Sequence, residues 1–263
     1  MRTLIEDGVP VAGLVSAQRP CADAGPPIAA SAVTIVGESI SSPLEVSTQV
    51  DDAYQSIGAH VAALVPPEAR LQVGPGPLGA ATLGALDVPV HIDSGMLIDA
   101  TVDLDSRGLL VGVPSAAYLC GTGRLYSWAH GRKILRPIEE THDIGRLSSG
   151  DPFVAVNTAL EIDLDGNVNV EGTADEVLGG IGGHPDFAAA GARSTHGLSI
   201  VATKSHHAGV PTLVEPLSRP VSTPGYDVDV VVTERGGADL RGLDRDGRRC
   251  ALLRLWGGAR PAK

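Results

Sequence analysis

The sequence predicts an α/β fold built around a mainly parallel β-sheet, and three of its features support this. Short apolar runs of β-type alternate with segments of helical periodicity along most of the 263 residues. Glycine is abundant, at 33 residues, which suits tight turns between strands and helices. Aromatic residues are only 3% of the chain. The core therefore has to be built from Val, Leu, Ile and Ala, which fill closely packed parallel sheets.

The first well-defined helix is predicted over residues 51–64. Asp51 or Asp52 caps its start, and apolar residues recur along it at helical spacing. A Pro-Pro pair at 66–67 ends it, because proline breaks the helical hydrogen-bond pattern. Residues 71–86 then have the pattern of a strand, a glycine turn and a helix that begins at residue 80.

The remaining elements continue this alternation. An amphipathic helix is predicted over residues 247–256. The predicted strands are 32–37, 71–73, 88–93, 108–113, 133–138, 153–163, 198–203 and 227–234.

Charge and cysteine usage exclude several classes of function. The net charge is −11, from 20 basic and 31 acidic residues, so no basic surplus is present to neutralise nucleic-acid phosphates. Cys21, Cys120 and Cys250 lie far apart, which predicts neither a disulfide framework nor a metal site. No apolar run reaches the roughly 18 residues of a membrane span. Glu6 and Asp7 stand where a secretory signal needs an apolar core. We therefore expect a cytoplasmic protein that binds neither nucleic acid nor a membrane and holds no metal.

Two glycine-rich stretches are candidates for ligand binding. Residues 74–79 follow a predicted strand and precede a helix, a position that exposes N–H groups to an anion, although Pro75 and Pro77 remove two donors. Residues 179–187 carry four glycines around one isoleucine, which lets a ligand approach the backbone closely. Both stretches are also consistent with tight turns of purely structural purpose, and the prolines favour this for residues 74–79.

Several segments together resemble the acetyl-CoA hydrolase/4-hydroxybutyrate CoA-transferase family, whose members use a glutamate nucleophile. The resemblance runs from about residue 50 to residue 245. It implies a CoA-transferase-like open α/β/α sandwich that acts on acyl-CoA and a small carboxylate. The segments that carry it are GGIGGHPDF (179–187), VAVNTALEIDLDGNVNVE (154–171), VVTERGGADLRG (231–242), LQVGPGPLGAATLGAL (71–86), VHIDSGMLIDATVDL (90–104) and LSIVATKSHHAGVPTLVEPL (198–217).

The resemblance also implies a domain organisation. Family members carry two related α/β domains, and this chain is similar to the second. Residues 51–263 are then a CoA-transferase C-terminal-like domain, and residues 1–50 are a lead-in from the region between the domains. A domain without its companion leaves an apolar face uncovered. We therefore expect a homodimer, or a heteromer with a separately encoded partner that supplies the N-terminal domain.

The resemblance is weakest at the nucleophile, which in the family is the Glu of an H-S-E-M motif. When the sequence is aligned to this motif without gaps, with Met96 at the Met position, Gly95 takes the position of the Glu. With a two-residue insertion, His91 takes the His position and Asp93 the Glu position. Asp93 is therefore the candidate surviving nucleophile, since a carboxylate can form an acyl anhydride and then a CoA thioester. The alternative is that Asp93 only turns the chain after a strand.

Other site residues follow from the matching motifs. Gly182 and Gly183 correspond to the family's glycine loop, whose N–H groups face the thioester oxygen as an oxyanion hole. Gly74 and Gly76 correspond to a first glycine turn that lines the same cleft. Asn157 falls in a stretch near the carboxylate acceptor, and its alternative role is a hydrogen bond at a strand end.

Two titratable residues complete the candidates. His184 follows the glycine loop, where it is placed to act as a general base for water with Asp186 as its orienting partner. Its alternative role is contact with CoA or solvent. Glu234 lies in a matched strand and either contributes to the binding site or pairs with an arginine such as Arg235.

We therefore expect a CoA-transferase or thioester hydrolase that takes a CoA thioester as its substrate, with a degenerate or repurposed nucleophile position. The alternative is a non-catalytic CoA- or acyl-CoA-binding protein, or a subunit that needs an N-terminal-domain partner. A Gly95→Glu change that restored transfer would indicate a decayed transferase site.

Overall fold

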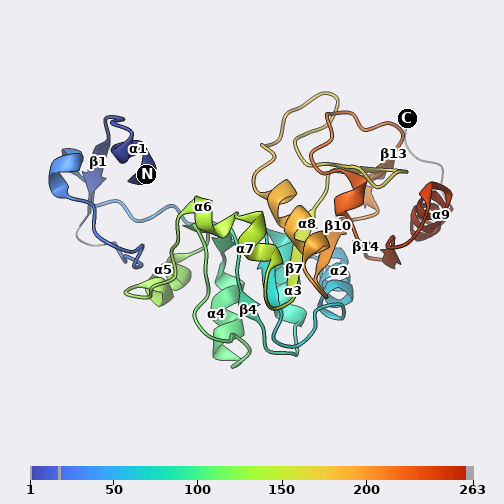
Figure 1. Cartoon of the computed structure of the whole chain (residues 1–263), viewed down its shortest axis with the longest axis horizontal. Coiled ribbons are helices and arrows are strands. Elements are labelled where there is room, and N and C mark those ends of the chain that lie inside the picture. Colours follow the sequence, from blue (N-terminus) through green and yellow to red (C-terminus); the bar gives the residue numbers. More distant parts are fainter. Residues whose placement is uncertain (1, 17–18, 259–263) are drawn as a thin grey trace.

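A six-stranded sheet forms the centre of the computed structural model, which describes residues 2–16 and 19–258 (Figure 1). Its strand order is β15-β14-β10-β7-β3-β4. Neighbouring strands pair in parallel except β14 and β15, which form an antiparallel hairpin at one edge. This confirms the predicted mainly parallel α/β sheet. The strands are β3 (Arg70–Val73), β4 (His91–Ile92), β7 (Phe153–Thr158), β10 (Leu198–Ala202), β14 (Val230–Thr233) and β15 (Gly236–Asp239).

Helices cover both faces of this sheet, as the sandwich architecture requires. On one face, α2 (Asp52–Ala62) and α3 (Pro77–Ala85) pack against each other and against the strands. On the other face, α7 (Ile144–Ser148) packs against α8 (His184–Arg193), which contacts β7 and β10 (Figure 1).

The central strand β7 shows why the sheet forms as it does. Its first five residues are all buried, because both of its faces are covered. Val154 and Val156 belong to the large core shared with α2 and α3, whereas Phe153 and Ala155 pack with α7 and α8. This alternation is the two-residue period of a strand.

The other elements lie around this core. The region between β4 and β7 contains β5 (Met96–Leu97), α4 (Asp99–Ser106), β6 (Tyr118–Leu119), α5 (Gly123–Ala129) and α6 (Ile138–Thr141). A three-stranded sheet is formed by β13 (Leu213–Val214), β8 (Glu161–Asp163) and β9 (Val168–Asn169). The remainder comprises the hairpin of β11 (His206–His207) and β12 (Val210–Pro211), a 3₁₀ turn over Gly225–Asp227 and α9 (Arg245–Leu255). Within the described ranges, no helix is both long and apolar enough to cross a membrane.

The N-terminal residues lie to one side of the sheet (Figure 1). They contain α1 (Arg2–Glu6), a 3₁₀ turn over Ala30–Ala32, and the parallel pair β1 (Ala12–Val15) and β2 (Thr34–Glu38). They meet the rest of the molecule around α5, where the Val46 N–H donates to the Gly121 carbonyl. The proposed boundary at residue 50 stays a prediction.

Several element predictions are confirmed and others are wrong. Asp51 caps α2 by accepting a hydrogen bond from the Tyr54 N–H at 3.0 Å. The helix expected from residue 80 begins earlier, at Pro77, and the stretch 153–163 divides into β7 and β8. No strand forms at 108–113 or 133–138, where only single bridges occur. Both segments lie outside the edge strand β4. Their apolar side chains pack on the core, but their backbones do not form a continuous ladder of β-sheet hydrogen bonds.

Candidate active site

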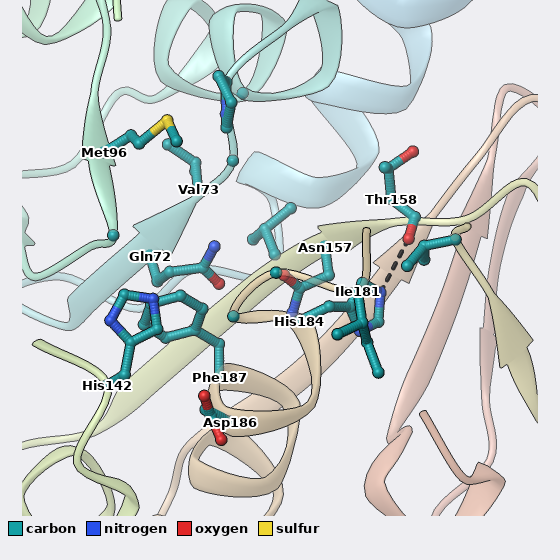
Figure 2. Close-up of a pocket in the computed structure, with 18 of the residues that line it drawn as sticks. Gln72, Val73, Met96, His142, Asn157, Thr158, Ile181, His184, Asp186 and Phe187 are labelled. Carbon is teal, nitrogen blue, oxygen red and sulfur yellow. Dashed lines mark hydrogen bonds between the residues drawn. The ribbon is translucent and has the colours of Figure 1, made fainter. Parts of the chain in front are cut away.

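A cavity of about 820 Å³ opens at the carboxyl ends of β3 and β7 (Figure 2). This is the edge of a parallel sheet at which α/β proteins bind ligands. The segments that contribute to its wall are the ends of β3 and β7, the first glycine turn, residues 95–96, the α6 region at 138–142, and residues 180–187.

The first glycine turn forms one wall. Gly74 lines the cavity, whereas Gly76 is not among its lining residues. Gly76 instead caps the start of α3 with φ at +111°, a conformation that favours glycine. Gly74 therefore lies in the cleft as predicted, whereas Gly76 shapes the turn and does not line the cavity.

The second glycine loop forms the opposite wall and leads into α8. Gly182 and Gly183 both line the cavity. Within the described chain, the backbone N–H groups of residues 180–183 donate to no other backbone group. They precede the first turn of a helix, where N–H groups and the helix dipole favour negative charge. The loop can therefore donate to a carbonyl or phosphate oxygen.

Two amide side chains are buried at the cavity with unused polar atoms. Gln72 and Asn157 are 3% and 7% exposed. Residue 72 pairs with Ala155 across β3 and β7, so Gln72 and Asn157 project from the same face of the sheet (Figure 2). Among the described residues, neither Gln72 Oε1 nor Asn157 Nδ2 has a hydrogen-bond partner. Leaving such a group unpaired costs about 1–3 kcal/mol, so these two atoms are suited to a polar ligand group.

His142 also lines the cavity, and its ring fills a narrow space. It lies 4.7 Å from the Phe187 ring, centroid to centroid. A Cβ added at Gly95 would be 3.3 Å from two atoms of the His142 ring, and one added at Gly183 would be 2.5 Å from it. Burial lowers the pKa of His142, although the nearby Asp186 carboxylate opposes this.

His184 is held by both of its ring nitrogens. Nε2 lies 2.9 Å from the Thr158 carbonyl, and Nδ1 lies 2.7 Å from Thr223 Oγ1. A carbonyl only accepts, so Nε2 carries the proton and Nδ1 accepts from the threonine hydroxyl. Burial lowers the pKa of His184 to about 4. The ring therefore ties the glycine loop to β7, and the geometry leaves no nitrogen for the predicted base role.

Asp93 lies outside the cavity lining and is paired with arginine. It is 6% exposed, and its two oxygens accept from Arg146 at 2.8 Å each. Arg70 approaches the same carboxylate at 3.6 Å. This ion pair raises the pKa of Arg146 and fastens the segment that carries His142 to the end of β4. This geometry favours a structural role for Asp93 over a role as the nucleophile.

Glu234 is likewise a structural carboxylate in this arrangement. It accepts hydrogen bonds from the Ser205 N–H at 2.8 Å and from the Ser205 hydroxyl. Burial alone would raise its pKa, but the hydrogen bonds from Ser205 outweigh burial and hold the pKa below its ordinary value. Arg235 lies 3.6 Å away, and Glu234 does not line the cavity.

The cavity lining carries few charges. Its carboxylates are Glu139 and Asp186. Across the described ranges, no group of three or more His, Cys, Asp or Glu side chains is placed to hold a metal ion.

Sequence reasoning missed Gln72 and His142. Gln72 had a detectable signal, since it is the one polar residue within the predicted strand at 71–73, directly before the glycine turn. The sequence carried no signal for His142, because the residues that surround its ring are distant in the chain.

A mainly parallel α/β sheet with glycine loops and two buried amides around one cavity is typical of α/β proteins that bind a ligand at the carboxyl edge of the sheet. Residues 121–256, just over half of the chain, match the family model described as acetyl-CoA hydrolase/transferase C-terminal domain. The chain belongs to this family.

Curated relatives share this region. The chain is 28% identical over 234 residues to a butyryl-CoA:acetate CoA-transferase from Anaerostipes caccae, covering 80% of this chain and 51% of that relative. It is 30% identical over 221 residues to a succinyl-CoA:cyclohexane-1-carboxylate CoA transferase from Geobacter metallireducens, covering 76% and 50%. The chain thus spans about half the length of the curated relatives it matches.

Solved structures show the same fold. RipA from Yersinia pestis matches with a TM-score of 0.86 at 27% identity, covering 96% of this chain and 61% of that one. A 4-hydroxybutyrate CoA-transferase from Porphyromonas gingivalis matches with a TM-score of 0.80 at 27% identity, covering 94% and 62%.

Proposed function

We propose that the chain binds an acyl-CoA thioester in this cavity and takes part in CoA transfer or thioester hydrolysis. The observation that carries the proposal is the set of unused hydrogen-bonding groups around the cavity. Among the residues that the structure describes, the N–H groups of the loop at 180–183 have no backbone partner, and the two buried amides offer one acceptor and one donor. The two curated relatives named above are CoA-transferases, which supports acyl-CoA as the ligand.

In this proposal, the glycine loop binds the part of the substrate that becomes negative. The N–H groups of Gly182 and Gly183 donate to the thioester oxygen, and they do so most strongly when that oxygen carries charge in the tetrahedral intermediate. Asn157 Nδ2 donates to a carboxylate or a bound acid. The acyl chain lies against the apolar lining that Leu78, Met96 and Val156 provide.

The test measures binding of acetyl-CoA, butyryl-CoA and free CoA by calorimetry and native mass spectrometry, with Gln72→Leu as the diagnostic variant. This change removes a buried, unpaired amide, so the free protein should be as stable as wild type or more stable. Binding should weaken about tenfold, which corresponds to about 1.4 kcal/mol. Gln55→Leu is the matched control, because Gln55 is exposed on α2. Unchanged affinity in Gln72→Leu, or no binding of any acyl-CoA, would contradict the proposal.

A second candidate role is a non-catalytic or partner-dependent subunit. The observation that favours it is the apolar surface of the N-terminal residues, where Leu14, Val36, Ile40 and Leu44 are 69%, 62%, 87% and 83% exposed. Exposed apolar groups gathered in one region mark an interaction surface. A second copy, or a polypeptide with the family's N-terminal half, would cover it. Light scattering of wild type and of Ile40→Asp/Leu44→Asp tests this, since a monomer in both would contradict self-association.

A further inference from the structure

We propose that His142 is the general base of this site and that the chain hydrolyses acyl-CoA rather than transferring CoA to a second acid. This role rests on the acyl-CoA binding proposed above.

The position of the ring is the first observation. His142 packs against Gly95 and Gly183. A Cβ added at Gly183 would lie 2.5 Å from the ring and clash with it, and one added at Gly95 would make a tight contact at 3.3 Å. Gly95 stands where the ungapped resemblance puts the family's glutamate. A side chain at position 95 and the ring at position 142 thus compete for one space, and here the imidazole occupies it. In this proposal, the imidazole of His142 acts at the wall of the cavity where the resemblance places a carboxylate nucleophile.

The surroundings of the ring leave one nitrogen free for water. Nδ1 lies 2.9 Å from Thr141 Oγ1, and that hydroxyl lies 3.5 Å from the Ile138 carbonyl. In this proposal, the Thr141 hydroxyl donates to the Ile138 carbonyl and accepts from Nδ1–H, the tautomer that leaves the lone pair on Nε2. Among the described residues, none hydrogen-bonds to Nε2. Contact with Phe187 fixes the plane of the ring.

The protein also fixes the segment on which His142 lies. Arg146, in the following helix α7, forms two hydrogen bonds with the buried Asp93. Arg146 Nε also donates to the Glu140 carbonyl at 2.7 Å. These contacts hold the residues on both sides of His142 against the sheet, so Asp93 and Arg146 are positioning residues.

The hydrolytic step follows from this geometry. His142 Nε2 takes a proton from water as the water oxygen attacks the thioester carbonyl carbon. The glycine-loop N–H groups donate to the oxygen of the tetrahedral intermediate. The C–S bond then breaks, and the CoA thiolate takes the proton from the imidazolium. Water and acyl-CoA thus give a free acid and CoA thiol, and His142 returns to its neutral form.

The charge state of the ring supports this assignment. Burial keeps the pKa of His142 below its ordinary value, so the ring is neutral and basic at pH 7. The carboxylates that line the same cavity are Glu139 on α6 and Asp186 on α8. Asp186 raises the pKa of His142, so it stabilises the imidazolium once this forms. His184, the other histidine of the cavity, has both nitrogens committed.

The experiment compares binding and turnover in the same preparations. Acyl-CoA binding is measured by native mass spectrometry. Thiol release from acetyl-CoA and butyryl-CoA is followed with a thiol reagent in H₂¹⁸O, with and without added acetate. The variants are His142→Gln and His142→Asn, and the matched control is His207→Gln, whose side chain is exposed on β11.

We expect wild type and His207→Gln to bind acyl-CoA and to release thiol with ¹⁸O in the acid. Both His142 variants should lose about 10²–10⁴-fold in kcat, with binding affinity kept within about threefold. In wild type, kcat/KM should rise with pH through a pKa below about 6.5 and then level off, and the variants should lose this profile.

The outcomes separate the two proposals. Absence of acyl-CoA binding would overturn the proposed function itself. Binding without thiol release overturns only the role of His142, and so does a flat pH profile of wild type below pH 7 or a His142 variant within threefold of wild type. A covalent CoA adduct with transfer to acetate would overturn hydrolysis while leaving binding intact.

Discussion

A glutamine introduced at position 95 should crowd the His142 ring, because its Cβ would already be in tight contact with that ring. Glutamine has the shape of glutamate without its charge, so attraction to the imidazole cannot mask the collision. The added Cβ alone would lie 3.3 Å from two atoms of the His142 ring and one atom of the Phe187 ring. Carbon contacts are best at roughly 3.5–4.0 Å, so the two rings must shift by a few tenths of an ångström to admit even this Cβ. We expect Gly95→Gln to lower the free energy of unfolding by about 1–3 kcal/mol.

The double variant should relieve this collision. His142→Ala alone removes the contact with Phe187, which costs about 1 kcal/mol. In Gly95→Gln/His142→Ala, the glutamine enters the vacated space. The double variant should therefore be more stable than the sum of the single effects predicts, by about 1–2 kcal/mol, within the range found for residues in contact.

Urea denaturation of the four proteins in this cycle, without ligand, measures the coupling. The matched control is Gly84→Gln, because Gly84 is exposed on α3 and an added Cβ there meets nothing within 4 Å. Combined with His142→Ala, it should be additive. Additivity within about 0.5 kcal/mol in the Gly95 cycle would refute the shared-space argument. So would a Gly95→Gln protein as stable as Gly84→Gln.

Three further predictions concern the same region. Gly183→Ala places a Cβ 2.5 Å from the His142 ring, so it should cost about 1–3 kcal/mol in urea and lower thiol release; wild-type stability would contradict the close approach. Arg146→Met leaves the Asp93 carboxylate buried without its main partner and should cost about 3–5 kcal/mol by thermal denaturation, whereas a small effect would show that water replaces the pair. The folded-state pKa of His184 is about 4, below its unfolded value of about 6.5, so its contribution of about 3 kcal/mol is complete above pH 6.5 and is lost as pH falls towards 4. The urea midpoint of wild type should therefore fall more steeply over this range than that of His184→Asn, and parallel curves would contradict the buried neutral ring.

The glycine motifs show how far sequence reasoning reaches into the site. Gly74, Gly182, Gly183 and Asn157 were singled out by motif, and all four line the cavity. Their binding roles stay predictions. Glycine turns after strands have a local cause, the tight reversal of the backbone, so the sequence marks them directly.

The titratable candidates were harder to judge from sequence. Asp93 and His184 are both of the right chemical type, yet their surroundings favour structural roles. Arg146 takes up both oxygens of Asp93, and Thr158 and Thr223 take up both nitrogens of His184. Whether such a group is free or already bonded depends on partners that are remote in the chain.

Local patterns by themselves determined the strands of the sheet core, the capped start of α2 and the glycine turns, because propensity, periodicity and capping act over a few neighbouring residues. Only the tertiary structure decided which side chains face the cavity. Gly95, His142 and Gly183 come from three separate segments, and they meet at the cavity beyond the carboxyl ends of β3 and β7. The missing Cβ atoms of two glycines make room for a histidine from a third segment, and packing of that kind is a property of the folded chain.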